Sequence, residues 1–203
     1  MAKDDKQKTK NISEDAILKA EFGYIAQATS QANEDRARVT NFYLITLGSF
    51  IAAIFSNDIP ISESLEQVVM NVGFGLLFTL VTIQGVLTLL QLARLRGAWF
   101  ESVTAMNQIK RYYQEQFPNL EKAFRWRDET LPPRFKRNSV GYYLALQVAM
   151  LSGITLAVAL GEFLNAVQSI DYAELTICLV AAVVSIFILM RVYKRIVESQ
   201  KKQ

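Results

Sequence analysis

Apolar residues in this sequence gather in four long runs that contain no charged side chain. The runs cover residues 39–57, 67–93, 138–161 and 175–190. A transmembrane helix needs about 20 apolar residues, because each residue adds about 1.5 Å across a core about 30 Å thick. The first three runs are long enough. The fourth is short, but the long side chain of Arg191 can reach the membrane surface from its end. The pattern therefore predicts four transmembrane helices.

Charges outside these runs alternate in sign along the chain. All 22 Lys and Arg residues lie in three segments, with seven in residues 1–38, ten in 94–137 and five in 191–203. The segments 57–67 and 162–174 carry only acidic charges. Because cytoplasmic loops of membrane proteins are rich in Lys and Arg, this alternation predicts that both termini and the 94–137 segment face the cytoplasm. We expect the chain in the bacterial cytoplasmic membrane.

The fold class that follows is an all-α, polytopic membrane protein with long cytoplasmic helical extensions. Apolar residues recur at helical spacing before the first run and after the second, so both helices should continue into the cytoplasm. The expected parts are a disordered tail (1–10), a cytoplasmic helix (11–38), the first and second spans (39–57 and 67–93), a helix continuing the second span (94–117), a basic connector (118–137), the third and fourth spans (138–161 and 175–190) and a cytoplasmic tail (191–203).

The residue inventory argues against an enzyme. The chain has no His and a single Cys, Cys178, which lies in the fourth run. Catalytic pairs that use His and metal sites ligated by His are therefore excluded. No Asp, Glu, Lys or Arg lies within a run, which argues against a proton-coupled transporter. We expect no catalytic residues, no metal and no cofactor, and we expect no nucleic-acid partner.

Small residues repeat every fourth position through the third run: Gly141, Ala145, Ala149, Gly153, Ala157 and Gly161. Small residues at this spacing let helix backbones approach closely in lipid, so the stripe predicts a helix-association surface. The partner could be another helix of this chain or a helix of a second copy. Because Ala and Gly are common in spans, an accidental match is the competing interpretation.

The second run carries an amide and hydroxyl stripe, formed by Gln84, Thr88 and Gln91. Gln147 of the third run should lie at a similar depth and could be its partner. Amides in hydrocarbon need hydrogen-bond partners, so this face should point into the bundle, at another subunit or at water. Two interpretations follow, namely interhelical hydrogen bonding and the lining of a pore.

Basic and aromatic residues interleave in the connector. The residues that could contact an anionic ligand or a lipid headgroup are Arg125, Trp126, Arg127, Arg134, Lys136 and Arg137. The simplest interpretation is a cytoplasmic loop with aromatic side chains at headgroup level. The alternatives are a site for a nucleotide or another signal ligand, and a site for a specific lipid.

The layout of the first half of the chain resembles that of the SLATT-type membrane effectors of bacterial conflict systems. The likeness lies in residues 20–56 and 68–117, where a cytoplasmic helix enters a tight pair of spans that a long helix follows. It is one of architecture and covers about half the chain, and four spans stand here in place of two. The resemblance implies a small membrane module that oligomerises and perturbs the membrane when a cytoplasmic signal arrives.

We therefore expect a homo-oligomeric membrane effector or pore-forming subunit that responds to a cytoplasmic cue, for example in antiphage defence. The alternative is a non-catalytic scaffold or accessory subunit that docks a cytoplasmic protein through its helical hairpin. The expected partners are the lipid bilayer, further copies of the chain, and a cytoplasmic protein or anionic ligand.

Overall fold

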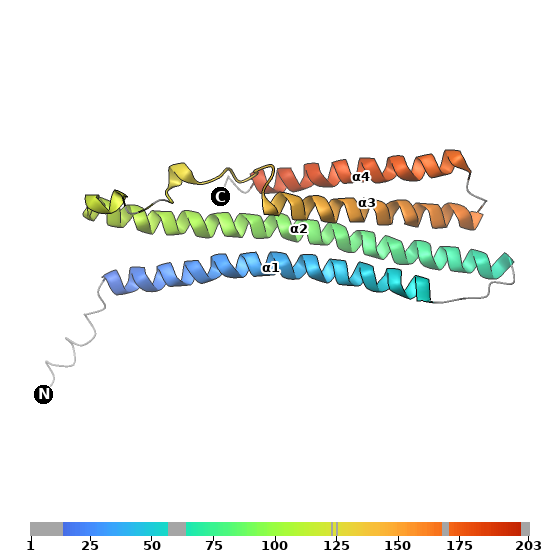
Figure 1. The fold of residues 1–203 in the computed structure, drawn as a ribbon, viewed down its shortest axis with the longest axis horizontal. Coiled ribbons are helices and arrows are strands. Elements are labelled where there is room, and N and C mark those ends of the chain that lie inside the picture. The colour runs from blue at the N-terminus through green and yellow to red at the C-terminus, as the bar shows by residue number, and fades with distance from the viewer. Residues whose placement is uncertain (1–13, 57–63, 123, 125, 168–170, 200–203) are drawn as a thin grey trace, which may run out of the picture. The chain divides into compact units, whose positions relative to one another are not determined.

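A computed structural model of the chain describes residues 14–56, 64–122, 124, 126–167 and 171–199. All regular secondary structure in these residues is helical (Figure 1). The long helices are α1 (Glu14–Ser56), α2 (Ser64–Gln116), α3 (Val140–Val167) and α4 (Tyr172–Ser199). Two short 3-10 helices, η1 (Pro118–Lys122) and η2 (Asp128–Thr130), lie between α2 and α3. The prediction of an all-α fold is confirmed.

Some of the expected segments lie outside the described residues. These are the predicted tail (1–10), Asn57 at the end of the first predicted span, Arg125 of the connector, and residues 200–203 of the C-terminal tail.

Helices α1 and α2 are much longer than a membrane is thick. They contain 43 and 53 residues, which correspond to about 65 Å and about 80 Å along the helix axis. No Pro interrupts either helix, and Gly97 lies within α2 without ending it. Pro118 follows the end of α2 closely, as expected of a residue that cannot continue a helix. Each predicted extension therefore forms one helix with the apolar run that it adjoins.

All four long helices are long and apolar enough to cross a membrane. Many large apolar side chains point outward from them. Ile45 of α1, Leu80 of α2 and Val183 of α4 are each about two-thirds exposed. Apolar outer faces of this extent suit a lipid environment rather than water. These helices are therefore candidate membrane spans.

The chain forms two compact units. Unit 1 comprises Met1–Glu34 and Gly97–Pro133, and unit 2 comprises Asp35–Arg96 and Arg134–Gln203. In the part of unit 1 that the structure describes, the beginning of α1 runs antiparallel to the end of α2. The Tyr113 hydroxyl donates to Asp15 Oδ1 at 3.1 Å, and the Thr29 hydroxyl lies 4.0 Å from Met106 Sδ.

Unit 2 contains an apolar core to which all four long helices contribute. Its buried members are Tyr43 and Leu47 of α1; Val81, Leu89, Leu92 and Ala93 of α2; Ala145, Val148 and Ala149 of α3; and Leu189, Tyr193 and Val197 of α4. Within this unit α3 and α4 lie side by side (Figure 1). The core is rich in small residues on α3, which brings the neighbouring helices close to its backbone.

Candidate functional site

The small residues of α3 mostly face inward. Gly141, Ala145, Ala149 and Gly153 are buried, and Ala157 and Gly161 are half-buried. A Cβ atom at Gly153 would lie 2.6 Å from Ile186 Cγ1 and 2.9 Å from the Ala182 carbonyl oxygen of α4. The structure thus places Gly153 against α4 of the same chain, at a point where no larger residue fits.

Gly141 lies in a second cluster, at the end of α3 that follows the connector. The Tyr193 hydroxyl of α4 donates to the Gly141 carbonyl oxygen at 3.3 Å. Two buried arginines of unit 2 complete the cluster. The positive charges of Arg36 and Arg96 interact electrostatically with Tyr193. The Arg96 charge also interacts with that of Arg36. Arg96 Nε donates to the Arg134 carbonyl oxygen at 3.2 Å, which attaches the end of the connector to α2.

A largely buried hydroxyl cluster lies midway along the helices of unit 2, and no sequence pattern predicted it. The Thr82 and Thr155 hydroxyls are 2.9 Å apart, and the Ser152 hydroxyl donates to the Thr82 carbonyl oxygen at 3.2 Å. A Cβ atom at Gly85 would lie 2.8 Å from the Tyr43 hydroxyl and 2.9 Å from Ser152 Oγ. The pair Ser152 and Thr155, one helical turn apart, was the only available signal in the sequence.

The residues of the predicted amide stripe differ in exposure: some face the interior of the helix bundle, and others are exposed. Gln84 Nε2 donates to the Thr46 hydroxyl of α1 at 3.4 Å, and Thr88 is buried. Gln91 and Gln147, by contrast, are exposed. Gln84 therefore takes part in an interhelical hydrogen bond, which was one of the two interpretations of the stripe.

Gln91 and Gln147 lie at nearly the same level along α2 and α3. These helices run antiparallel, with Thr82 opposite Thr155 and Gly85 beside Ser152. Continuing this register brings residue 91 level with residue 146, one position from Gln147. Gln91 and Gln147 are thus two exposed amides at one level of the candidate spans.

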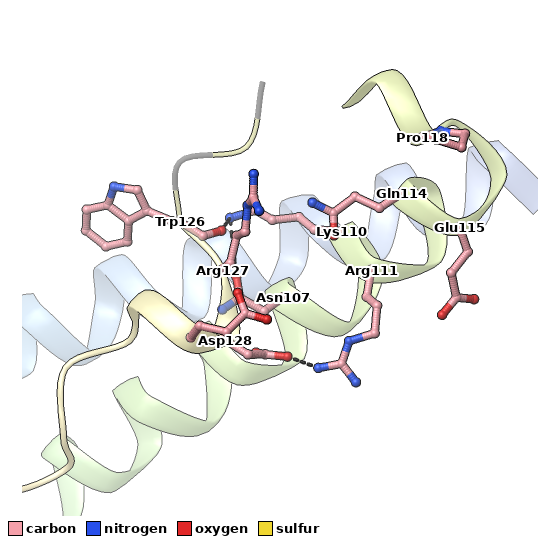
Figure 2. A pocket seen from close by; sticks show the side chains of 10 residues that line it. Asn107, Lys110, Arg111, Gln114, Glu115, Pro118, Trp126, Arg127 and Asp128 are labelled. Atoms are coloured by element: carbon pink, nitrogen blue, oxygen red, sulfur yellow. Dashed lines mark hydrogen bonds and ion pairs between the residues drawn. The ribbon is translucent and has the colours of Figure 1, made fainter. Parts of the chain in front are cut away.

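Unit 1 contains a pocket of about 270 Å³ beside the last turns of α2 (Figure 2). Its lining consists of Asn107, Lys110, Arg111, Gln114, Glu115, Pro118, Trp126, Arg127, Asp128 and Glu129. Lys110 Nζ donates to the Trp126 carbonyl oxygen and to Asn107 Oδ1, both at 3.4 Å. Arg111 pairs with Asp128 (Figure 2). Three lysine and arginine side chains and three carboxylates line the pocket, so its formal charges balance.

Two side-chain amide nitrogens of this pocket are buried without a hydrogen-bond partner among the described residues. They are Asn107 Nδ2 and Gln114 Nε2. Asn107 is only 3% exposed. Buried hydrogen-bond donors normally have acceptors. A small ligand with acceptor atoms could accept hydrogen bonds from these two nitrogens. Trp126 is largely exposed at the edge of the pocket and offers a flat apolar face.

The residues of the predicted basic connector belong to both units. Trp126 and Arg127 line the pocket of unit 1, and Arg127 Nε donates to the Phe124 carbonyl oxygen at 3.0 Å. Arg134, Lys136 and Arg137 belong to unit 2. Arg134 is half-buried, whereas Lys136 and Arg137 are exposed.

Metal-ligating residues do not cluster in the described part of the chain. Those residues contain no group of three or more His, Cys, Asp or Glu side chains that could hold a metal ion. Cys178 is buried in α4. The sequence matches no family model, no curated protein and no solved structure.

Proposed function

We propose that the chain is a homo-oligomeric membrane effector or pore-forming subunit of the bacterial cytoplasmic membrane that acts when a cytoplasmic cue arrives. In this proposal α1–α4 are the four spans, and both termini and the 94–137 segment lie in the cytoplasm. The distribution of Lys and Arg between the apolar runs supports this orientation. Antiphage defence is the biological setting that the resemblance to SLATT-type effectors suggests.

The observation that carries the proposal is the exposure of Gln91 and Gln147 at one level of the candidate spans. An amide that faces hydrocarbon alone loses its hydrogen bonds to water, which is costly. Contact with a second copy would give these amides partners, and a water-filled path between copies would hydrate them. Both arrangements require more than one chain.

The pocket of unit 1 is our candidate for the site that receives the cue. Its buried donors on Asn107 and Gln114 can bind acceptor atoms of a small ligand, and Trp126 can stack on a planar one. Because the lining charges balance, hydrogen bonding rather than net charge would dominate recognition. Arg111 and Asp128 hold the pocket wall through their ion pair.

The experiment is controlled expression in bacteria with a potential-sensitive dye. We expect wild-type protein to depolarise the membrane, and we expect Gln91→Leu and Gln147→Leu to reduce depolarisation at equal protein level. Gln84→Leu is the matched control, because Gln84 bonds within the chain to Thr46. Gln84→Leu should lower the stability of the folded chain and should have a smaller effect on the association of copies. Depolarisation that is absent at every expression level, even with the native genomic neighbours present, would refute the pore-forming function.

A scaffold that docks a cytoplasmic partner is the second candidate. A groove of about 420 Å³ in unit 1 favours it, since Leu18, Phe22, Ile109 and Phe124 give the groove an apolar lining. A side chain of a partner protein could insert there. The two functions differ in one observation, because a scaffold expressed alone should leave the membrane potential unchanged.

A further inference from the structure

A groove of about 770 Å³ lies along α3 and α4 in unit 2. Most of its lining is apolar or aromatic, and the members of that part are Phe135, Tyr142, Leu146, Val183, Val184, Ile186, Phe187, Ile188 and Met190. The remaining lining residues are three cations, Arg137, Arg191 and Lys194. Among the residues that the structure describes, no carboxylate lines the groove, although Glu198 lies 3.9 Å from Lys194.

The apolar and charged parts of the groove are separated along α4. The apolar residues occupy positions 183–190, and the cations Arg191 and Lys194 follow them toward the C-terminus. From Val183 to Lys194 the helix rises about 16 Å. Arg137, three residues before the start of α3, lines the same groove. All three cations are exposed, so their charged groups are accessible to a ligand.

Aromatic rings hold two of these cations at the groove. The Arg191 guanidinium lies 4.5 Å from the centre of the Phe187 ring, and Lys194 Nζ lies 5.5 Å from the centre of the Phe135 ring. Phe135 also makes edge contacts with Tyr142 and Tyr193. The connector thus contributes an aromatic anchor that limits the freedom of the charged side chains.

We propose that this groove binds one anionic phospholipid. The lipid phosphate would lie between Arg137, Arg191 and Lys194, and an acyl chain would follow the apolar part along Val184 and Phe187. Charge complementarity selects this occupant, because three cations adjoin an apolar groove, and no carboxylate of the described residues lines it; Glu198 lies 3.9 Å from Lys194 but outside the lining. Arginine binds phosphate through paired hydrogen bonds, and lysine adds a point charge. The inference requires that α3 and α4 span the membrane, and it is independent of effector activity.

The groove also fits the proposed orientation. Arg137, Arg191 and Lys194 lie at the ends of α3 and α4 that we place at the cytoplasmic surface, where anionic lipid headgroups attract basic residues. A neutral lipid would fill the apolar part but bring no anionic group to the three cations, of which Lys194 alone has its ion pair with Glu198 among the described residues. A soluble phosphate ester would neutralise the cations and leave the apolar part empty. Only an anionic lipid satisfies both parts of the groove.

The test is native mass spectrometry of the purified full-length chain in a neutral detergent. Dioleoyl phosphatidylglycerol and dioleoyl phosphatidylcholine, which share acyl chains, are added separately at equal concentration. We expect wild-type protein to retain the anionic lipid preferentially. Arg191→Gln and Lys194→Gln should each weaken its retention about fivefold, as expected for loss of one basic residue near a phosphate. Glycerol phosphate, which lacks acyl chains, should not displace the lipid.

Arg195→Gln provides the matched control. Arg195 is exposed and adjoins Lys194 in α4, but it does not line the groove. It should therefore leave lipid retention unchanged. Equal retention of the two lipids would overturn the proposal, as would an effect of Arg195→Gln as large as that of Lys194→Gln. Displacement by glycerol phosphate would show that the cations bind a soluble phosphate ester instead. If the wild-type protein retains the anionic lipid but does not depolarise the membrane, the effector function is refuted and the lipid-binding proposal stands.

Discussion

The Tyr193 hydroxyl donates a hydrogen bond of 3.3 Å to the Gly141 carbonyl oxygen, which joins the last turns of α4 to the first turn of α3. Tyr193 is 3% exposed and also contacts Phe135 of the connector edge to face. A Cβ atom at Gly141 would lie 3.6 Å from this hydroxyl. One side chain therefore ties together α3, α4 and the connector.

Replacement of Tyr193 by Phe should lower the free energy of unfolding by about 1 kcal/mol. The ring and its packing remain, but the hydrogen bond to Gly141 is lost. Circular dichroism during titration with a denaturing detergent measures the loss. Tyr172→Phe is the control, because Tyr172 is 92% exposed and should tolerate the change. Equal stability of both variants would mean that the hydrogen bond contributes nothing.

Replacement of Gly153 by Ala should destabilise the pair α3 and α4 by about 1–3 kcal/mol. The added Cβ atom would lie 2.9 Å from the Ala182 carbonyl oxygen. Because this oxygen belongs to the backbone of α4, the clash cannot be relieved by moving a flexible side chain. Gly73→Ala is the matched control, since nothing lies within 4 Å of a Cβ atom there. That control should be neutral or mildly stabilising. The same unfolding titration compares the two, and an unaffected Gly153→Ala variant would contradict the close approach of α3 to α4.

Replacement of Thr155 by Val should cost about 0.6 kcal/mol, and at most about 1.7 kcal/mol, by removing the contact between the Thr82 and Thr155 hydroxyls. Thr176→Val should cost less, because the Thr176 hydroxyl is exposed and donates to the Tyr172 carbonyl oxygen of its own helix. Unfolding free energies of the two variants provide the comparison. An equal or larger loss for Thr176→Val would show that the contact between the Thr82 and Thr155 hydroxyls contributes nothing.

Cysteine labelling of the two ends of α4 tests the proposed orientation. In a Cys178→Ser background, Tyr172→Cys should react with an impermeant maleimide in intact cells, because acidic residues mark the outer segments. Glu198→Cys should react only after the membrane is permeabilised. Tyr172 and Glu198 are both exposed, so access to the side chain does not limit either reaction. The reverse pattern would invert the topology.

The helices could be predicted from the sequence because their signals are local. Uncharged runs of sufficient length indicate spans, and the absence of Pro from α1 and from α2 indicates that both helices continue beyond them. The repeat from Gly141 to Gly161 likewise identified a compact face of α3. It did not identify the partner, because Ile186 and Ala182 meet Gly153 only after α4 folds back.

The hydroxyl cluster and the division of the connector depend on tertiary structure. Thr82 and Thr155 lie far apart in the sequence, and each also resembles an ordinary Thr that bonds to its own helix backbone. Residues 118–137 read as one basic segment, yet the boundary between the units falls after Pro133. The two consecutive prolines, Pro132 and Pro133, were the only sequence signal of that boundary.

The close approach at Gly153 also constrains how the chain is made. Translation delivers α3 before α4, so the Gly153 side of α3 has no Ile186 to cover it until α4 has folded back. In a chain truncated after Val167, the Gly153 side of α3 would remain uncovered and could bind another helix. A three-helix intermediate that lacks α4 would therefore expose a surface to which other helices could bind. Completion of α4 covers this surface.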